Sequence, residues 1–316
     1  MANSNKNPDP EESQPELLPA PLAYLNPEFL NSPDGRLLRI LSEYSEPLSR
    51  FRREKIQDTV VFFGSARFAS LPDAQNALTI LEKPGSAKPA PPEQQPGGKD
   101  GDALQAALKR AHAAVEMARY YEEARRLASM LTEWTLTLPG KRHRFVVTSG
   151  GGPGIMEAAN RGAREAGGKT IGLNIRLPFE QYPNQYITPE LNFEFHYFFM
   201  RKYWFAYLAK ALVVFPGGFG TLDELFEILT LAQTHKLAKK ILVIVYGREY
   251  WNRVLNLEVL ADAGTISPED VNGFTMVDTP EEAFEVLKEG LTRFHLQPQQ
   301  ARHVPEEGPE IAKTLP

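Results

Sequence analysis

The chain has 316 residues, which is enough for one large α/β domain or two small ones. Its 35 basic and 40 acidic residues give a formal charge of −5, which argues against a broad nucleic-acid-binding face but leaves room for a local basic pocket. The chain has no cysteine, which excludes disulfides, thiolate metal sites and a cysteine nucleophile. We expect neither a secretory signal nor a membrane span, because the first residues are polar and the apolar runs are short. A cytoplasmic location fits this composition.

Proline-rich polar stretches divide the chain. Residues 1–30 predict a flexible N-terminal arm, and residues 297–316 predict a flexible tail. A third such stretch, near 84–101, predicts a flexible insertion. Residues 31–296 are therefore expected to form a single α/β domain, which begins with a helix over 36–54.

Strand patterns alternate with helix patterns along this domain. Continuous β-branched and aromatic runs predict buried strands over 59–63, 145–148, 170–174, 211–215 and 241–246. Composition and spacing predict helices over 102–135, 155–166, 198–210, 222–234, 251–261 and 280–294. The alternation predicts a Rossmann-like, doubly wound parallel sheet with helices on both faces. Ligands of such sheets bind beyond the carboxyl ends of the strands, so the loops that follow the strands are the candidate site.

Three of these loops, over 64–67, 149–154 and 216–221, are rich in glycine or begin with small residues. Glycine lets the backbone approach a ligand closely, and free amides at a helix start attract phosphate. The alternative is that the glycines only close tight turns. Two glycine loops and an arginine loop at one edge of a sheet favour a phosphorylated ligand.

Glu224 has two interpretations. Thr221 and Glu224 have the spacing of a capping box, in which Thr221 caps a helix and Glu224 reaches back to its first amide. Alternatively, Glu224 lies one turn inside a helix whose start faces the ligand, where a carboxylate could meet a developing sugar cation. The spacing alone does not separate the two.

Arg201 and Lys202 lie in an aromatic segment over 195–207. Adjacent cations on a helix usually face solvent. In aromatic surroundings they are often buried or stacked, and a buried cation requires an anion, either a phosphate or Glu224.

Residues 216–224 resemble the PGGxGTxxE motif of the LOG (Lonely Guy) family. The segment 200–202 resembles the arginine–lysine element of that family, and the segments 149–157 and 64–67 resemble its other two loops. The resemblance covers roughly residues 58–262, with the motifs in the usual order.

The resemblance implies a phosphoribohydrolase, which releases free base and ribose 5-phosphate from nucleoside 5′-monophosphates of the purine or cytokinin type. It gives Arg201 and Glu224 the catalytic roles. The 5′-phosphate would be held by Gly217, Gly218, Gly220 and Thr221. The ribose and base would be bound by Gly64, Ser65, Arg67, Ser149, Gly150, Gly151, Glu157 and Lys202. The resemblance implies a homodimer or higher homo-oligomer, and the scheme requires no metal and no cofactor.

Two other function classes stay open. A carrier that resembles molybdenum cofactor carriers would share the glycine loops and bind a phosphorylated ligand without cutting it, but the presence of both Arg201 and Glu224 favours the enzyme. A regulatory nucleotide sensor is the third hypothesis and rests only on the terminal extensions. The label "lysine decarboxylase", which many family members carry, is rejected, because that reaction usually requires pyridoxal phosphate on a lysine and no segment here indicates such a site.

Overall fold

A computed structural model describes residues 19–83, 99–178, 182–234, 236 and 239–297. The expected N-terminal arm (in its residues 1–18), the core of the expected insertion (84–98) and nearly all of the expected tail (298–316) lie outside the described residues. The chain divides into two compact units, Met1–Ser42 and Glu43–Pro316. The domain boundaries expected from the sequence stay predictions.

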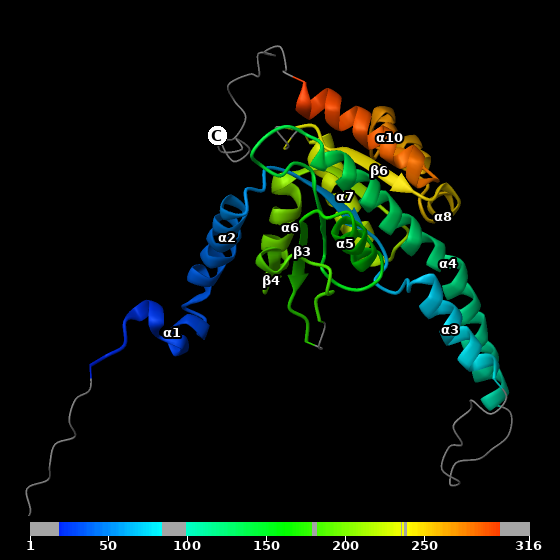
Figure 1. Ribbon diagram of the computed structural model, residues 1–316, viewed down its shortest axis with the longest axis horizontal. Coiled ribbons are helices and arrows are strands. Elements are labelled where there is room, and N and C mark those ends of the chain that lie inside the picture. The colour runs from blue at the N-terminus through cyan, green and yellow to red at the C-terminus, as the bar shows by residue number, and fades with distance from the viewer. Residues whose placement is uncertain (1–18, 84–98, 179–181, 235, 237–238, 298–316) are drawn as a thin grey trace, which may run out of the picture. The chain divides into compact units, whose positions relative to one another are not determined.

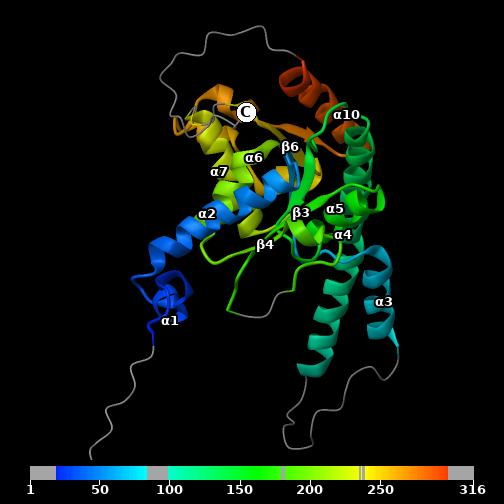
Figure 2. The same ribbon diagram turned by 60° about the vertical axis from the view of Figure 1, so that its left-hand side comes forward.

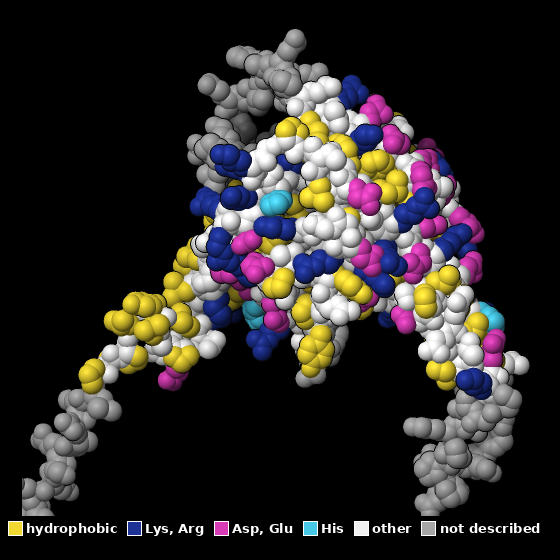
Figure 3. Space-filling view, viewed as in Figure 1, with side chains coloured by type: hydrophobic (Ala, Val, Ile, Leu, Met, Phe, Trp, Pro, Cys, Tyr) yellow, Lys and Arg dark blue, Asp and Glu magenta, His cyan; other side chains and the backbone are white. Residues whose placement is uncertain are grey.

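The described part of the first unit is helical. A 3-10 turn, η1 (Ala23–Leu25), precedes α1 (Pro27–Asn31), and α2 (Arg36–Arg53) begins in this unit and ends in the second. The Asn26 side chain caps α1 by accepting from the amides of Glu28 and Phe29. Hydrophobic side chains gather on the surface of this unit (Figure 3), and the exposed ones are Leu22, Tyr24, Leu25, Leu37, Leu38 and Leu41.

The second unit is built on a seven-stranded parallel sheet in the order β4-β3-β2-β1-β5-β6-β7. The strands are β1 (Thr59–Phe63), β2 (Val146–Ser149), β3 (Thr170–Ile175), β4 (Asn192–Phe195), β5 (Ala209–Val214), β6 (Leu242–Tyr246) and β7 (Thr275–Val277). Every residue of β1 and β2 is buried, as a strand covered on both faces requires. The Rossmann-like fold predicted from the sequence is confirmed.

Helices cover both faces of this sheet (Figures 1 and 2). On one face α4 (Lys99–Leu136), α5 (Ile155–Glu165) and α10 (Pro280–Leu291) enclose the main core, which includes Val60 and Phe62 of β1. The other face carries α6 (Phe198–Leu208) and α7 (Phe219–Gln233). There Phe205 packs edge-on against Phe63, with ring centroids 4.9 Å apart. The remaining elements are α3 (Leu71–Glu82), η2 (Pro189–Leu191), α8 (Arg248–Val254), α9 (Glu258–Asp262), η3 (Pro268–Asn272) and the π-helical turn η4 (Thr292–Leu296).

The structure adds elements that the sequence patterns did not predict. The edge strands β4 and β7 have only four and three residues and lack the continuous apolar run that marks a buried strand. The predicted helix over 251–261 is divided, since α8 ends at Val254 and α9 begins at Glu258. The helix α3 was not predicted.

The chain reverses its direction of progress across the sheet at β1. From β1 it adds β2, β3 and β4 on one side, and α6 then returns it to β5 on the other side of β1. Such a reversal opens a crevice beyond the carboxyl ends of the two central strands. The fold therefore directs attention to the loops after β1 and β5.

The close packing of α4 on α5 depends on Gly162. A Cβ at this position would lie 1.9 Å from the carbonyl oxygen of Arg125 on α4, so we expect Gly162→Ala to lower the free energy of unfolding by about 1–3 kcal/mol. The matched control is Gly220→Ala in α7, where nothing lies within 4 Å of the added Cβ. That change should be neutral or stabilising by up to about 1 kcal/mol. Urea unfolding measures both, and equal stabilities would contradict the packing argument.

Candidate functional site

The loops after β1, β2 and β5 meet at one edge of the sheet. The amide of Ser65 donates to the carbonyl of Pro216 at 3.0 Å, and the amide of Ile155 donates to the carbonyl of Ser65 at 3.1 Å. The loop of β1 is thus hydrogen-bonded to both of its neighbours. The structure brings together the three loops that the sequence singled out.

The loop after β5 leads into α7 without a side-chain cap. Gly218 is the N-cap residue, and α7 begins at Phe219. Thr221 therefore lies inside the first turn, and the capping-box interpretation of Thr221 and Glu224 is wrong. In the described part of the chain no side chain caps this helix start, so its first amides are available to an anion. The hydroxyl of Tyr250 donates to the carbonyl of Gly217 at 2.8 Å and supports the loop.

Glu224 lies one turn into α7 and is 7% exposed. Burial raises the pKa of its carboxyl to about 7, although Lys202 and Arg201 act to lower it. The ammonium of Lys202 lies 3.9 Å from the carboxylate. At neutral pH the group exchanges between its two protonation states, as a catalytic acid or base requires.

Arg201 lies on α6 and is largely buried. Its Nε donates to the carbonyl of Leu173 at 2.8 Å, and its guanidinium carbon lies 5.0 Å from the centroid of the Phe205 ring. Burial lowers the pKa of this guanidinium, and the Glu224 carboxylate opposes that effect. Arginine stays charged in proteins, so Arg201 remains a cation in apolar surroundings close to Glu224.

Lys202 points to the carboxylates of α7. Its ammonium forms ion pairs with Asp223 at 2.8 Å and Glu227 at 2.9 Å, in addition to the longer contact with Glu224. These pairs join α6, which carries Arg201, to α7, which carries Glu224. The ribose- or base-binding role expected of Lys202 would require it to leave these partners or to share them with a ligand.

The loop after β2 is held by side-chain hydrogen bonds. The hydroxyl of Ser149 donates to Asn160 at 2.7 Å and accepts from the amide of Gly151 at 3.0 Å. The side-chain amide of Asn184 donates to the carbonyls of Gly151 and Gly152, each at 3.1 Å. Ser149 is fully buried, so its hydroxyl shapes this loop.

Other expected site residues lie around this edge. Glu157 is half-buried on α5 and accepts a hydrogen bond from the hydroxyl of Tyr121 at 2.8 Å. Arg67 is exposed, and its amide donates to the side chain of Ser65. The sequence interpretation did not include Tyr121 or Asn160. Asn160 had a weak signal, since it is a polar residue directly after two alanines on the apolar face of a helix.

The described residues contain no group of three or more His, Asp or Glu side chains that could hold a metal ion. Within the same part of the chain, no helix is long and apolar enough to cross a membrane.

The raised pKa of Glu224 makes stability depend on pH. The folded state holds the proton up to a pKa of about 7, whereas the usual value is 4.5. The stability from this proton is complete below about pH 4.5 and is lost as the pH rises through 7. Relative to Glu224→Gln, the wild type should lose about 3 kcal/mol of unfolding free energy over this range. Denaturant titrations of both proteins below pH 4.5 and above pH 7 measure this loss. A difference in unfolding free energy between the two proteins that does not change with pH would contradict the pKa assignment.

Comparisons with known proteins agree with these motifs. A family model described as "Possible lysine decarboxylase" matches residues 156–287. The chain is 32% identical over 154 residues to the cytokinin riboside 5′-monophosphate phosphoribohydrolase LOG7 of Arabidopsis thaliana, covering 47% of this chain and 64% of that protein. It is 28% identical over 145 residues to a cytokinin riboside 5′-monophosphate phosphoribohydrolase of Mycobacterium marinum, covering 46% and 77%. The chain thus spans less than two thirds of the length of the Arabidopsis relative.

Among solved structures, the chain is similar to a molybdenum cofactor carrier protein from Chlamydomonas reinhardtii. The identity is 17%, the TM-score is 0.38, and the match covers 74% of this chain and 99% of that one. A similarity at this level carries no functional argument. The family-model match and the curated relatives, together with the motifs described above, support the LOG family as the family that this chain resembles.

Proposed function

We propose that this protein hydrolyses the N-glycosidic bond of nucleoside 5′-monophosphates to free base and ribose 5-phosphate. The observation that supports this most directly is the buried Glu224 carboxyl with its pKa near 7, one turn inside a helix whose uncapped start follows a glycine loop. A carboxylate next to a phosphate-binding helix start suits a substrate with both a phosphate and a sugar.

The phosphate would bind first. The amides at the start of α7 and the helix dipole attract the 5′-phosphate to Gly217, Gly218, Gly220 and Thr221. The phosphate takes no part in the bond cleavage, so its binding energy serves to position the ribose. The backbone of the loop after β2 and the side chain of Glu157 would then line the ribose and base.

The carboxylate would act on the sugar. As the bond between C1′ and the base nitrogen breaks, its electron pair leaves with the base and positive charge develops on the ribose. The ionised Glu224 stabilises this charge and accepts a proton from the attacking water. The hydroxyl of the water joins C1′, and its proton is passed to the departing base.

Arg201 would complete the charge arrangement. A buried guanidinium beside Glu224 favours the ionised carboxylate and can donate to the phosphate or to the leaving base.

The relatives named as cytokinin riboside 5′-monophosphate phosphoribohydrolases support a purine-type base, and we extend the proposal to ordinary purine nucleotides. The homo-oligomeric state and the cytoplasmic location expected from the sequence stay predictions.

The first test is the release of free base from AMP, GMP, IMP, CMP and UMP, with the matching nucleosides as controls. The wild type should act on monophosphates only. Glu224→Gln should bind nucleotide normally but lose about 100- to 10,000-fold in kcat. The matched control is Glu227→Gln, which lies one turn farther along α7 and also pairs with Lys202.

Glu227→Gln should retain most of the activity. Full turnover by Glu224→Gln would remove Glu224 from the mechanism. Tight nucleotide binding by a wild type that releases no base would instead favour the carrier hypothesis.

A second test concerns the position of Arg201. A Cβ at residue 150 would lie 2.6 Å from the Arg201 guanidinium and 2.7 Å from the sulfur of Met156, so Gly150→Ala must displace one or both. We expect kcat/KM for base release to fall by about 100-fold. The Tm should change little, because both contacted groups are the ends of flexible side chains. Adding Met156→Ala to the Gly150→Ala variant removes the contact with the sulfur of Met156 but keeps the contact with Arg201, so the activity should stay low. Wild-type activity in Gly150→Ala would contradict this role of Arg201.

A further inference from the structure

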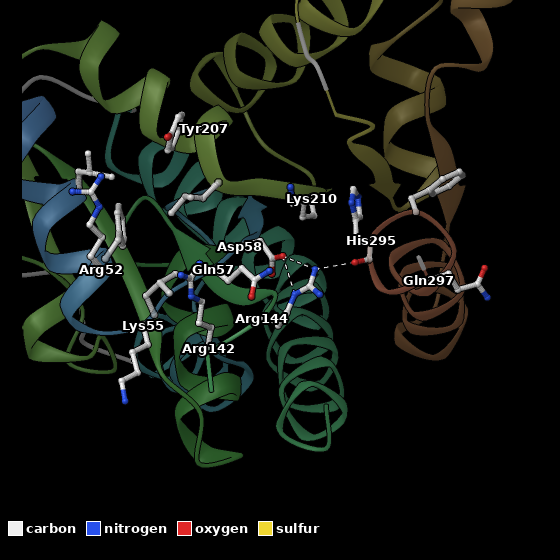
Figure 4. Close-up of a pocket in the computed structure, with 15 residues that line it drawn as sticks. Arg52, Lys55, Gln57, Asp58, Arg142, Arg144, Tyr207, Lys210, His295 and Gln297 are labelled. Atoms are coloured by element: carbon white, nitrogen blue, oxygen red, sulfur yellow. Dashed lines mark hydrogen bonds and ion pairs between the residues drawn. The ribbon is translucent and has the colours of Figure 1, made fainter. Parts of the chain in front are cut away.

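A cavity of about 450 Å³ lies at the edge of the sheet opposite to the LOG motifs (Figure 4). Its lining comes from the residues that precede β1 and β2, from the start of β5, from the end of α2 and from η4. These are the amino ends of the strands, whereas the LOG motifs lie at the carboxyl ends. β1 has five residues, which separates the two edges by about 16 Å.

The cavity is strongly basic. Among the described residues, one carboxylate, Asp58, lines it. Five cationic side chains line it as well, namely Arg52, Lys55, Arg142, Arg144 and Lys210. The chain as a whole carries a charge of −5, so this concentration of positive charge is local. Figure 4 shows Asp58 and Arg144 pointing toward one another near Lys210 and His295, while Lys55 extends away from them.

The single carboxylate is already engaged. Asp58 accepts from the Arg144 guanidinium at 2.7 and 3.0 Å through one oxygen, and from the amide of Phe145 at 2.6 Å through the other. It is 1% exposed. Asp58 therefore compensates Arg144 and has little capacity left for a further cation.

Two lysines extend the positive charge beyond Arg144. Burial lowers the pKa of Lys210, and burial together with the charge of Lys210 lowers the pKa of Lys239 to about 7. Lys239 donates to the carbonyl of Tyr207 at the cavity wall. The Nε2 atom of His295 is buried and has no hydrogen-bond partner among the described residues. Lys210 and the unsatisfied ring nitrogen of His295 therefore line the space beside Asp58, and Lys239 contacts the wall at Tyr207.

We propose that this cavity is a second binding site, separate from the LOG motifs, and that it takes a small phosphorylated metabolite. A phosphate carries close to two negative charges near neutral pH, which suits a cavity lined by five cationic side chains and by one carboxylate that is already paired with Arg144. The apolar wall, which includes Phe51 and Leu208, can cover an uncharged part of such a ligand. The volume is that of a typical small-molecule site.

Lysine labelling of the wild type tests the site directly. The protein is treated with acetic anhydride, with and without inorganic pyrophosphate up to about 1 mM, and the labelling of each lysine is measured by mass spectrometry. Potassium chloride at matched ionic strength is the control. We expect pyrophosphate, but not chloride, to slow the labelling of Lys210 several-fold, because a bound anion shields the amine and holds its proton. The exposed Lys141, which does not line the cavity, should be labelled at an unchanged rate.

Two variants make the test independent of labelling. Titration calorimetry of the wild type should resolve two sites for pyrophosphate. Lys210→Gln and Arg142→Gln should each weaken the binding of pyrophosphate at one of these sites, while Lys141→Gln should bind as the wild type does. Arg142 is exposed, so its replacement tests the site even if Lys210→Gln does not fold. Protection confined to Lys202, with unchanged binding by both variants, would place pyrophosphate only at the carboxyl edge and overturn the proposal. Base release by the carboxyl-edge site is not needed for either result, so failure here leaves the proposed function untouched.

Discussion

The parallel pairing of β1 with β5 is the constraint on which the candidate site depends. About 145 residues separate the two strands along the chain, yet Phe63 is in register with Val214. This register places the arginine loop after β1 beside the glycine loop after β5. It also sets α6, which returns the chain to β5, where Arg201 can reach across to the carbonyl of Leu173 on β3. The loops, the cation and the carboxylate are thus brought together by one crossing of the chain.

The site holds its charges at some cost to stability. Taking a carboxylate out of water is unfavourable unless partners compensate it, and Lys202 and Arg201 compensate Glu224 only in part, because its pKa stays raised. Lys202 is itself divided among three carboxylates. Incomplete compensation leaves Glu224 able to change its protonation state near neutral pH. A fully satisfied ion pair would be more stable and chemically inert.

The two edges of the sheet differ in how they would hold an anion. At the carboxyl edge, backbone amides at an uncapped helix start would provide the attraction, and side chains would add chemistry. At the amino edge the helix dipoles have the opposite sense, so an anion there must be held by side-chain cations, and Lys210 and Arg144 lie at that edge. The local excess of positive charge at the amino edge is therefore stronger support for an anion site than the same charges would be at a helix start.

The sequence by itself determined the fold class, because strands covered on both faces must be continuous apolar runs and their alternation with helices leaves few arrangements. It also determined which loops carry the LOG motifs. It missed β4 and β7, because such short edge strands carry too little periodicity, and it also missed α3. Only the tertiary structure decided between the two interpretations of Glu224, since a capping box and a buried carboxylate share the same spacing and differ only in where the helix begins. The tertiary structure alone also brought Asp58, Arg144, Lys210 and His295 together, because residues from four separate segments form a charged cavity only when the sheet aligns their strands and helices.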